Sequence, residues 1–164
     1  MSSAARRTRS APAIDLVVDS PLWRNELDAA AVIRRAIGAA AEMTGAGADR
    51  ELAVLLCDDA AMRDLNGRWR GRPEPTNVLS FPGAAGTGTL GDIAIAYETT
   101  AREAEGEGKP FDDHLAHLAV HGFLHLLGYD HESDAEAAAM ERLEVAILAR
   151  LGIADPYAQH GTAT

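Results

Sequence analysis

The chain has 164 residues, of which 47% are hydrophobic, so it is long enough for one hydrophobic core and too short for a second domain of ordinary size. Its formal net charge of −10 argues against indiscriminate binding to nucleic acid, because neutralising phosphate groups depends on Lys and Arg. No stretch approaches the roughly 18 consecutive apolar residues that span a bilayer, and the N-terminus lacks the apolar middle of a signal peptide, so we expect a cytoplasmic protein without membrane contact.

The predicted organisation is one folded domain at residues 13–154, flanked by two poorly packed ends. Residues 1–12 combine arginines with Ser and Ala, which is typical of a disordered leader, and residues 155–164 are predicted to form a flexible tail. The single cysteine, Cys57, ends the apolar run 52–57 and is predicted to be a buried thiol in a strand. One cysteine allows no disulfide within a monomer, which fits a reducing compartment.

Apolar and β-branched runs predict the strands, and glycines predict the turn between two of them. In chain order, the predicted strands and extended runs are 14–18, 52–57, 77–81 and 93–96. Four glycines within nine residues separate the last two, at positions 83, 86, 88 and 91. They indicate a turn between strands and not a phosphate-binding loop, since no Gly-Lys-Ser/Thr sequence is present.

Caps and glycine stops predict the helices. Ser20-Pro21 is predicted to open a helix that runs to Met43 and ends at Gly45, and Asp58 is predicted to cap a short helix through Leu65. The later helices are predicted at 97–105, at 111–127, and from the capping box at 133–136 to about residue 151. Because strands and helices do not alternate regularly, we expect an α+β fold with a small central mixed β-sheet packed with helices.

Histidine spacing in the helix at 111–127 predicts a metal site on this central helix and the turn after it. His121 and His125 are four residues apart and therefore lie on one helix face. Gly128 can adopt a left-handed conformation that folds the chain back and brings His131 to the same ion. Three imidazoles at about 2.0–2.1 Å leave one tetrahedral position for water, the arrangement of catalytic zinc. We expect one Zn²⁺, although imidazole also binds other divalent ions.

Two further histidines, His114 and His117, lie on the same face, one or two turns before the pair. Each is either a core histidine with a satisfied hydrogen bond, or part of a second layer around the ion, or a residue lining the cleft.

The spacing of the three histidines also occurs in metzincin proteases, but their sequence carries a glutamate after the first histidine, where this chain has Gly122. In those proteases the glutamate takes a proton from the zinc-bound water. Glycine cannot do so, which makes peptide hydrolysis the weaker interpretation.

Four arginines surround Trp69 within ten residues, at positions 63, 68, 70 and 72. Such a cluster either focuses a phosphate backbone onto one cleft or is an ordinary solvated helix end.

Several motifs, in matching order and spacing, resemble the YbeY family of bacterial metal-dependent endoribonucleases, at residues 65–71, 75–82, 90–93 and 121–131. The resemblance covers about residues 52 to 150. It implies an α+β fold, a zinc site formed by His121, His125 and His131, and a functional arginine at Arg70. Trp69 stands where family members usually have tyrosine, and residues 72–74 replace a common Lys-Asp-Lys, which removes positive charge from this loop.

The resemblance implies cleavage of single-stranded RNA, with a role in maturation of the 16S ribosomal RNA 3′ end and in ribosome quality control. Ribosomal RNA and ribosomal particles are then the expected partners. Two alternatives stay open. One is a ribosome-assembly or RNA-binding factor whose metal is mainly structural, and the other is a zinc hydrolase of another substrate class.

Overall fold

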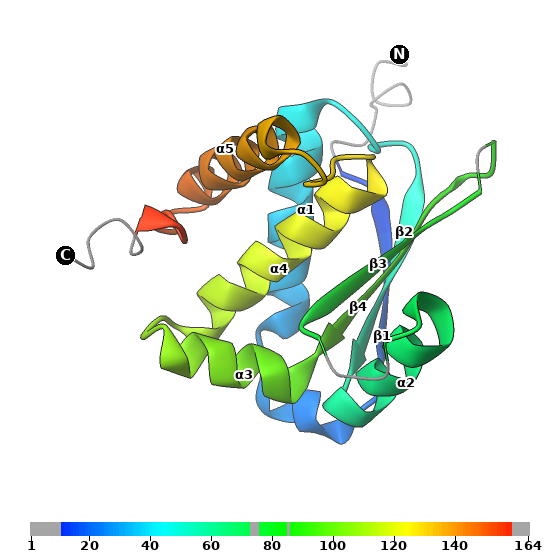
Figure 1. The fold of residues 1–164 in the computed structure, drawn as a ribbon, viewed down its shortest axis with the longest axis vertical. Helices are drawn as coiled ribbons and strands as arrows, with labels where there is room; N and C mark the ends of the chain where they lie inside the picture. The colour runs from blue at the N-terminus through cyan, green and yellow to red at the C-terminus, as the bar shows by residue number, and fades with distance from the viewer. Residues whose placement is uncertain (1–10, 73–75, 85, 159–164) are drawn as a thin grey trace, which may run out of the picture.

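A computed structural model of the chain describes residues 11–72, 76–84 and 86–158. Its strands form one sheet in the order β1-β2-β4-β3 (Figure 1). The strands are β1 (Ala13–Val18), β2 (Glu51–Cys57), β3 (Val78–Pro82) and β4 (Thr89–Ala96). β1, β2 and β4 run parallel, whereas β3 pairs antiparallel with β4 along an edge of the sheet. The mixed sheet and the α+β class predicted from the sequence are confirmed.

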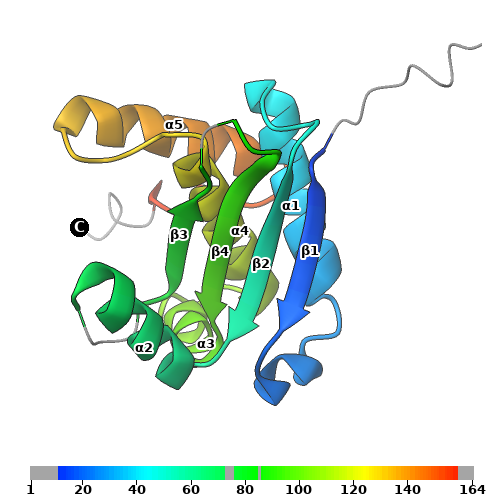
Figure 2. The same cartoon turned by 90° about the vertical axis from the view of Figure 1, so that its right-hand side faces the viewer.

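The helices lie on both faces of this sheet. They are η2, a short 3-10 helix (Pro21–Asn25), α1 (Ala29–Thr44), α2 (Asp59–Arg70), α3 (Tyr97–Gly106), α4 (Phe111–Leu126) and α5 (Asp134–Arg150). Figure 2 shows α1 and α4 behind the sheet, with α5 packed across them, and α2 on the opposite face. Within the described residues, no helix combines the length and the apolar character needed to cross a bilayer.

The hydrophobic core lies between the sheet and the layer of α1 and α4. Its fully buried side chains come from every one of these elements and include Ile33, Ile37, Ile93, Ile95, Leu115 and Phe123. A residue on α4 is consequently held by contacts on several sides, as the sequence predicted for a central helix.

The helix predicted from Ser20-Pro21 to Met43 is divided in the structure. Ser20 does cap a helix start, since its Oγ accepts a hydrogen bond from the backbone N–H of Leu22. The segment is nevertheless a 3-10 turn, because Trp23 is buried and its Nε1 donates to the carbonyl oxygen of Cys57 at 2.8 Å. The backbone of Glu26 then leaves the helical region, and α1 begins at Ala29.

The last predicted strand, 93–96, is longer in the structure, since β4 begins at Thr89. Gly91 lowers the strand propensity of this segment, so the sequence did not predict the longer strand. Gly91 is required there because its φ is +133° and a Cβ would lie 2.2 Å from the carbonyl oxygen of Phe81. The predicted glycine turn is the connection between β3 and β4, and Gly86 in it has a φ of +84°.

The predicted ends lie mostly outside the described residues. Residues 1–10 of the predicted leader and 159–164 of the predicted tail are not described. Tyr157, which the prediction assigned to the tail, is half-buried and contacts α4 and α5.

Candidate metal centre

The helix that carries the histidines is positioned by burial along nearly its whole length. α4 packs against α1 on one side and against β3 and β4 on the other, with Leu115, Ala119 and Phe123 fully buried. It ends where Gly128 takes a φ of +104°, and the N–H of Tyr129 donates to the carbonyl of Leu124 at 3.1 Å. This is the glycine turn that the sequence predicted, and it returns the chain toward the last turn of the helix.

The turn brings the three predicted histidines together. One nitrogen from each of His121, His125 and His131 lies within 4.8 Å of the others. The Nε2 atoms of His121 and His125 are 3.1 Å apart. Nitrogens about 2.0–2.1 Å from one tetrahedral ion lie about 3.3 Å from each other, so the pair already has the separation that an ion requires. The three imidazoles could therefore hold one metal ion.

Burial and neighbouring imidazoles also favour the neutral form of His125. Burial lowers the pKa of His125, and the positive charges that His121 and His131 would carry lower it further. A ligand imidazole must be neutral, so the lowered pKa favours the form of His125 that can bind metal.

A residue that the sequence reasoning missed, Glu144, stands behind the histidines. Its side chain is buried on α5, with 1% of the residue exposed. Nδ1 of His121 lies 2.6 Å from its Oε2, Nε2 of His117 lies 3.1 Å from its Oε1, and the hydroxyl of Tyr157 donates to Oε1. Burial alone would raise the pKa of Glu144, but the hydrogen bonds from His117, His121 and Tyr157 outweigh it and lower the pKa to about 2.

The sequence did contain a signal for Glu144. The buried side chains of α5 are Met140, Glu144, Ile147 and Leu148, which form one helical stripe with a single acid in it. A carboxylate in an apolar stripe requires a partner. Its partners lie 23 and 27 residues earlier on α4, so the spacing within α5 could not name them.

The two other histidines of α4 do not join the triad. Nε2 of His114, which is buried, lies 2.8 Å from Oε1 of Glu103 on α3. His117 faces Glu144, as described above. Both line a cavity of about 220 Å³ that also reaches His121. His117 thus belongs to a second layer behind the triad, one of the interpretations that the sequence left open, whereas His114 has a separate carboxylate partner.

Close packing explains why no glutamate follows the first histidine. A Cβ on Gly122 would lie 2.9 Å from Cγ2 of Ile93 and 3.3 Å from Oγ of Ser80. The Ser80 hydroxyl donates to the carbonyl oxygen of Gly122 at 2.9 Å, which holds α4 directly on β3. This helix face is pressed on the sheet, so position 122 has no room for the side chain that metzincin proteases carry there.

Arg70 lines the same cavity as the three predicted ligands. Its Nη2 donates to the carbonyl oxygen of Ser80 at 2.6 Å, and its guanidinium lies over the ring of Phe81, with Cζ 5.6 Å from the ring centroid. A cavity of about 650 Å³ is lined by residues of α2, β3, α4 and the following turn, among them Arg70, His121, His125 and His131. The predicted functional arginine and the predicted ligands thus face one space.

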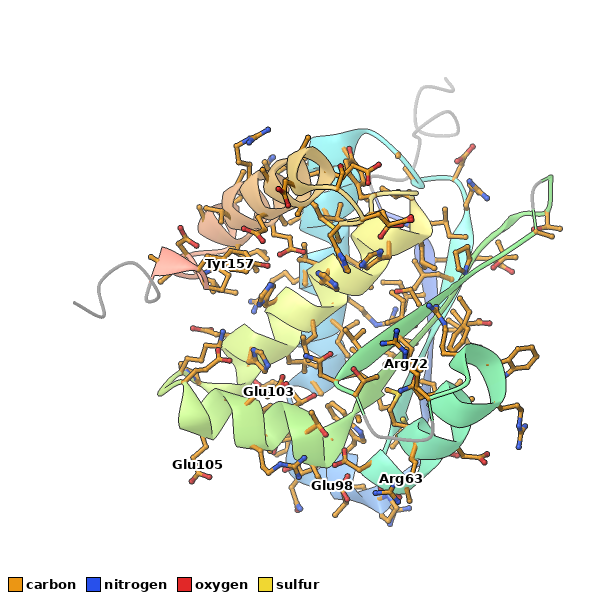
Figure 3. All side chains as sticks on the ribbon, viewed as in Figure 1. Arg63, Arg72, Glu98, Glu103, Glu105 and Tyr157 are labelled. Atoms are coloured by element: carbon orange, nitrogen blue, oxygen red, sulfur yellow. The ribbon has the colours of Figure 1, made fainter. Side chains whose placement is uncertain are left out.

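The arginine cluster around Trp69 is not a single surface. Arg68 pairs with Asp64 at 3.0 Å on the exposed side of α2. Figure 3 shows Arg63 and Arg72 near opposite ends of α2, on the other side of the sheet from Tyr157. Of the four arginines, Arg70 alone is among the residues that line the large cavity.

Comparison with known proteins gives a family match over most of the chain. Residues 21–152 match the model of the family described as endoribonuclease YbeY. A protein of that name from Rhodopseudomonas palustris strain BisA53 is 58% identical over 161 residues, covering 93% of this chain and 94% of the relative. Another from strain BisB18 is 60% identical and covers 90% and 93%.

Two further matches also cover most of this chain. A Bradyrhizobium protein called endoribonuclease YbeY is 57% identical, covering 90% of this chain and 93% of the relative. A solved solution structure from Thermotoga maritima has 23% identity and a TM-score of 0.49, covering 84% of this chain and 91% of its own. With the family model matched over residues 21–152 and relatives near 60% identity across nearly their full length, this chain belongs to the endoribonuclease YbeY family.

Proposed function

We propose that this protein is a zinc-dependent endoribonuclease that cuts single-stranded RNA. The observation that carries the proposal is the shared cavity: an arginine suited to phosphate and three imidazoles suited to one ion line the same space of about 650 Å³. The name of the relatives, endoribonuclease, supports RNA as the substrate. The cellular role that we propose with it is maturation of the 16S ribosomal RNA 3′ end and ribosome quality control in the cytoplasm, on ribosomal particles.

In the proposed mechanism, His121, His125 and His131 would hold the ion, which would supply Lewis acidity and the means to activate a water. Arg70 binds the phosphate. A guanidinium has five N–H donors, and the carbonyl of Ser80 uses one of them in the structure. The remaining donors can hold two phosphate oxygens at once and stabilise the negative charge that develops during cleavage.

The hydrogen bond from Arg70 to the Ser80 carbonyl also orients the guanidinium. Ser80 accepts from Arg70 through its carbonyl and donates through its hydroxyl to Gly122, which stands between the two helical histidines. One strand residue therefore fixes the guanidinium relative to the helix that carries the ion. Holding the phosphate and the ion at a fixed distance and orientation lowers the activation free energy by several kcal/mol in favourable cases.

The test is cleavage of a labelled single-stranded RNA, with the duplex of the same sequence and casein as parallel substrates. Arg70→Ala is expected to reduce cleavage about 10²- to 10³-fold while the metal content stays unchanged. Arg68→Ala, on the exposed side of the same helix, is the matched control and should cut RNA like the wild type. Loss of the ion in Arg70→Ala would contradict the assigned role.

The ligand set is tested separately by elemental analysis. The wild type is expected to carry one zinc per chain, and His125→Ala is expected to lose it. Full metal content in His125→Ala would refute the ligand set, and another metal at one equivalent would correct the ion while keeping the site.

A second candidate function is ribosome assembly with a mainly structural metal, and the missing carboxylate at Gly122 favours it. It predicts that the zinc-loaded wild type leaves RNA uncut and yet binds ribosomal particles. Metal-dependent cleavage that His121→Ala abolishes would exclude it, and cleavage of casein in place of RNA would favour a hydrolase of another substrate class.

A further inference from the structure

Glu144 contacts a ligand histidine without reaching the cavity where the reaction is proposed. It is 1% exposed and is not among the residues lining the large cavity. Its Oε2 lies 2.6 Å from Nδ1 of His121, whereas the ion would bind Nε2 of that ring, the atom 3.1 Å from Nε2 of His125. Glu144 therefore acts on the opposite side of the imidazole from the ion.

A buried carboxylate is costly unless donors surround it. Removing a carboxylate from water costs several kcal/mol, which good hydrogen-bond geometry has to offset. Glu144 has such an environment, because His117, His121 and Tyr157 all point a polar atom at its two oxygens. An apolar residue at this position of α5 would complete the core more simply, so the carboxylate calls for a reason other than packing.

We infer that Glu144 is the positioning residue of the metal centre, which holds His121 with a proton on Nδ1 and the lone pair of Nε2 presented to the ion. A neutral imidazole has one protonated nitrogen and one free lone pair, and an ionised carboxylate can only accept. The contact at Nδ1 therefore selects the tautomer that binds metal through Nε2. This inference rests on the proposed ligand set.

His117 and Tyr157 hold the carboxylate of Glu144 in place. His117 is one turn before His121 on α4 and uses the other oxygen of Glu144. Tyr157 follows α5 and donates to that same oxygen, and its ring packs edge-on against the His117 ring with centroids 5.6 Å apart. The carboxylate is thus fixed by two groups on α4 and one group after α5. Figure 3 shows Tyr157 beside the far end of α5, on the same side of the sheet as α4.

The test measures zinc affinity by competition with a chromophoric chelator. Glu144→Gln keeps the shape of the side chain and removes its charge, and it is expected to bind zinc about 10- to 100-fold more weakly. Glu141→Gln changes an exposed acid on the same helix and is expected to match the wild type. Tyr157→Phe removes one donor to Glu144 without touching a ligand and is expected to weaken zinc binding about 3- to 10-fold.

A second readout separates positioning from a merely structural role. In metal-free protein, nitrogen-15 spectra of the imidazoles should show His121 protonated on Nδ1 in the wild type and in Glu141→Gln, and a mixture of tautomers in Glu144→Gln. Unchanged zinc affinity and tautomer in Glu144→Gln would overturn the inference, even where the variant unfolds more easily. Should Glu144→Gln fail to fold, Tyr157→Phe decides, and wild-type affinity in it would overturn the inference.

The outcome is distinguishable from failure of the proposed function, because neither readout uses RNA. Wild-type protein that binds zinc through His125 and leaves RNA uncut would refute the nuclease and leave Glu144 in its role. RNA cleavage by the wild type, together with unchanged zinc affinity in Glu144→Gln, would support the nuclease and refute the role of Glu144.

Discussion

Replacing Gly122 with alanine tests how closely α4, the helix that carries the histidines, is pressed on the sheet. The added Cβ would lie 2.9 Å from Cγ2 of Ile93, a fully buried β-branched side chain on a central strand, which has little freedom to turn aside. Such overpacking costs about 1–3 kcal/mol. Alanine also favours a helix over glycine by about 0.8–1 kcal/mol. The net change in unfolding free energy is therefore expected to run from about zero to a loss of about 2 kcal/mol.

A matched helix glycine isolates the packing cost. Gly38 lies inside α1, and a Cβ there would meet only the Cβ of Ala11 at 3.7 Å, an ordinary contact. Gly38→Ala should therefore gain about 0.8–1 kcal/mol from helix propensity alone. Urea unfolding of both variants at 25 °C, in the presence of a chelator, measures the difference.

We expect Gly122→Ala to be less stable than Gly38→Ala by about 1–3 kcal/mol. Equal stability of the two variants would contradict this packing cost, because it would mean that α4 and β4 move apart without losing stability. A shift of α4 would also move His121 and His125 relative to Arg70, which Ser80 holds on β3. RNA cleavage by Gly122→Ala is accordingly expected to fall while zinc content is retained.

Other predictions follow from single buried contacts. Trp23→Phe removes the donor to the Cys57 carbonyl and is expected to cost about 1–3 kcal/mol in urea unfolding; no loss would show that this bond does not hold η2. The Cys57 thiol is fully buried, and burial, helped by nearby carboxylates, raises its pKa to about 12, so native protein at pH 8 should resist a thiol reagent that labels the urea-unfolded chain at once. Burial by itself raises the pKa of Glu103, but the hydrogen bond from His114 helps to bring it below the ordinary value. This carboxylate therefore stabilises the fold above its unfolded pKa, and that contribution is lost as the pH falls through the lowered folded value. Glu103→Gln should flatten the acid limb of stability against pH, whereas Glu105→Gln, whose side chain points away from α4 in Figure 3, should leave it unchanged.

The sequence identified the features of the candidate metal site that depend on neighbours along the chain. His121 and His125 share a face because a helix repeats every 3.6 residues, and Gly128 permits the positive φ that turns the chain toward His131. These relations need only the helix and its end, and the structure contains both where they were predicted. The roles of the three imidazoles as ligands remain a prediction for elemental analysis.

Predictions from the sequence were wrong where a distant residue decides the local conformation. The helix predicted from Pro21 to Met43 is interrupted because Trp23 donates a hydrogen bond to the carbonyl of Cys57, 34 residues later. Helix-capping preferences and helix propensities predict a helix start correctly, but they contain no information about a hydrogen-bond partner far along the chain. Tyr157 was assigned to a flexible tail for the same reason, since its hydrogen bond to Glu144 joins the chain end to α5.

By itself, then, the sequence determined the fold class, the clustered histidines and the turn that gathers them, because hydrophobic period, caps and glycine act over a few residues. Tertiary packing decided which residues surround that cluster. It brought Arg70 to the cavity through Ser80, placed Glu144 behind His121, and pressed Gly122 so closely against Ile93 that even an added Cβ would crowd it. Each of these contacts joins separate elements, and only burial of a common core brings such elements within hydrogen-bonding distance.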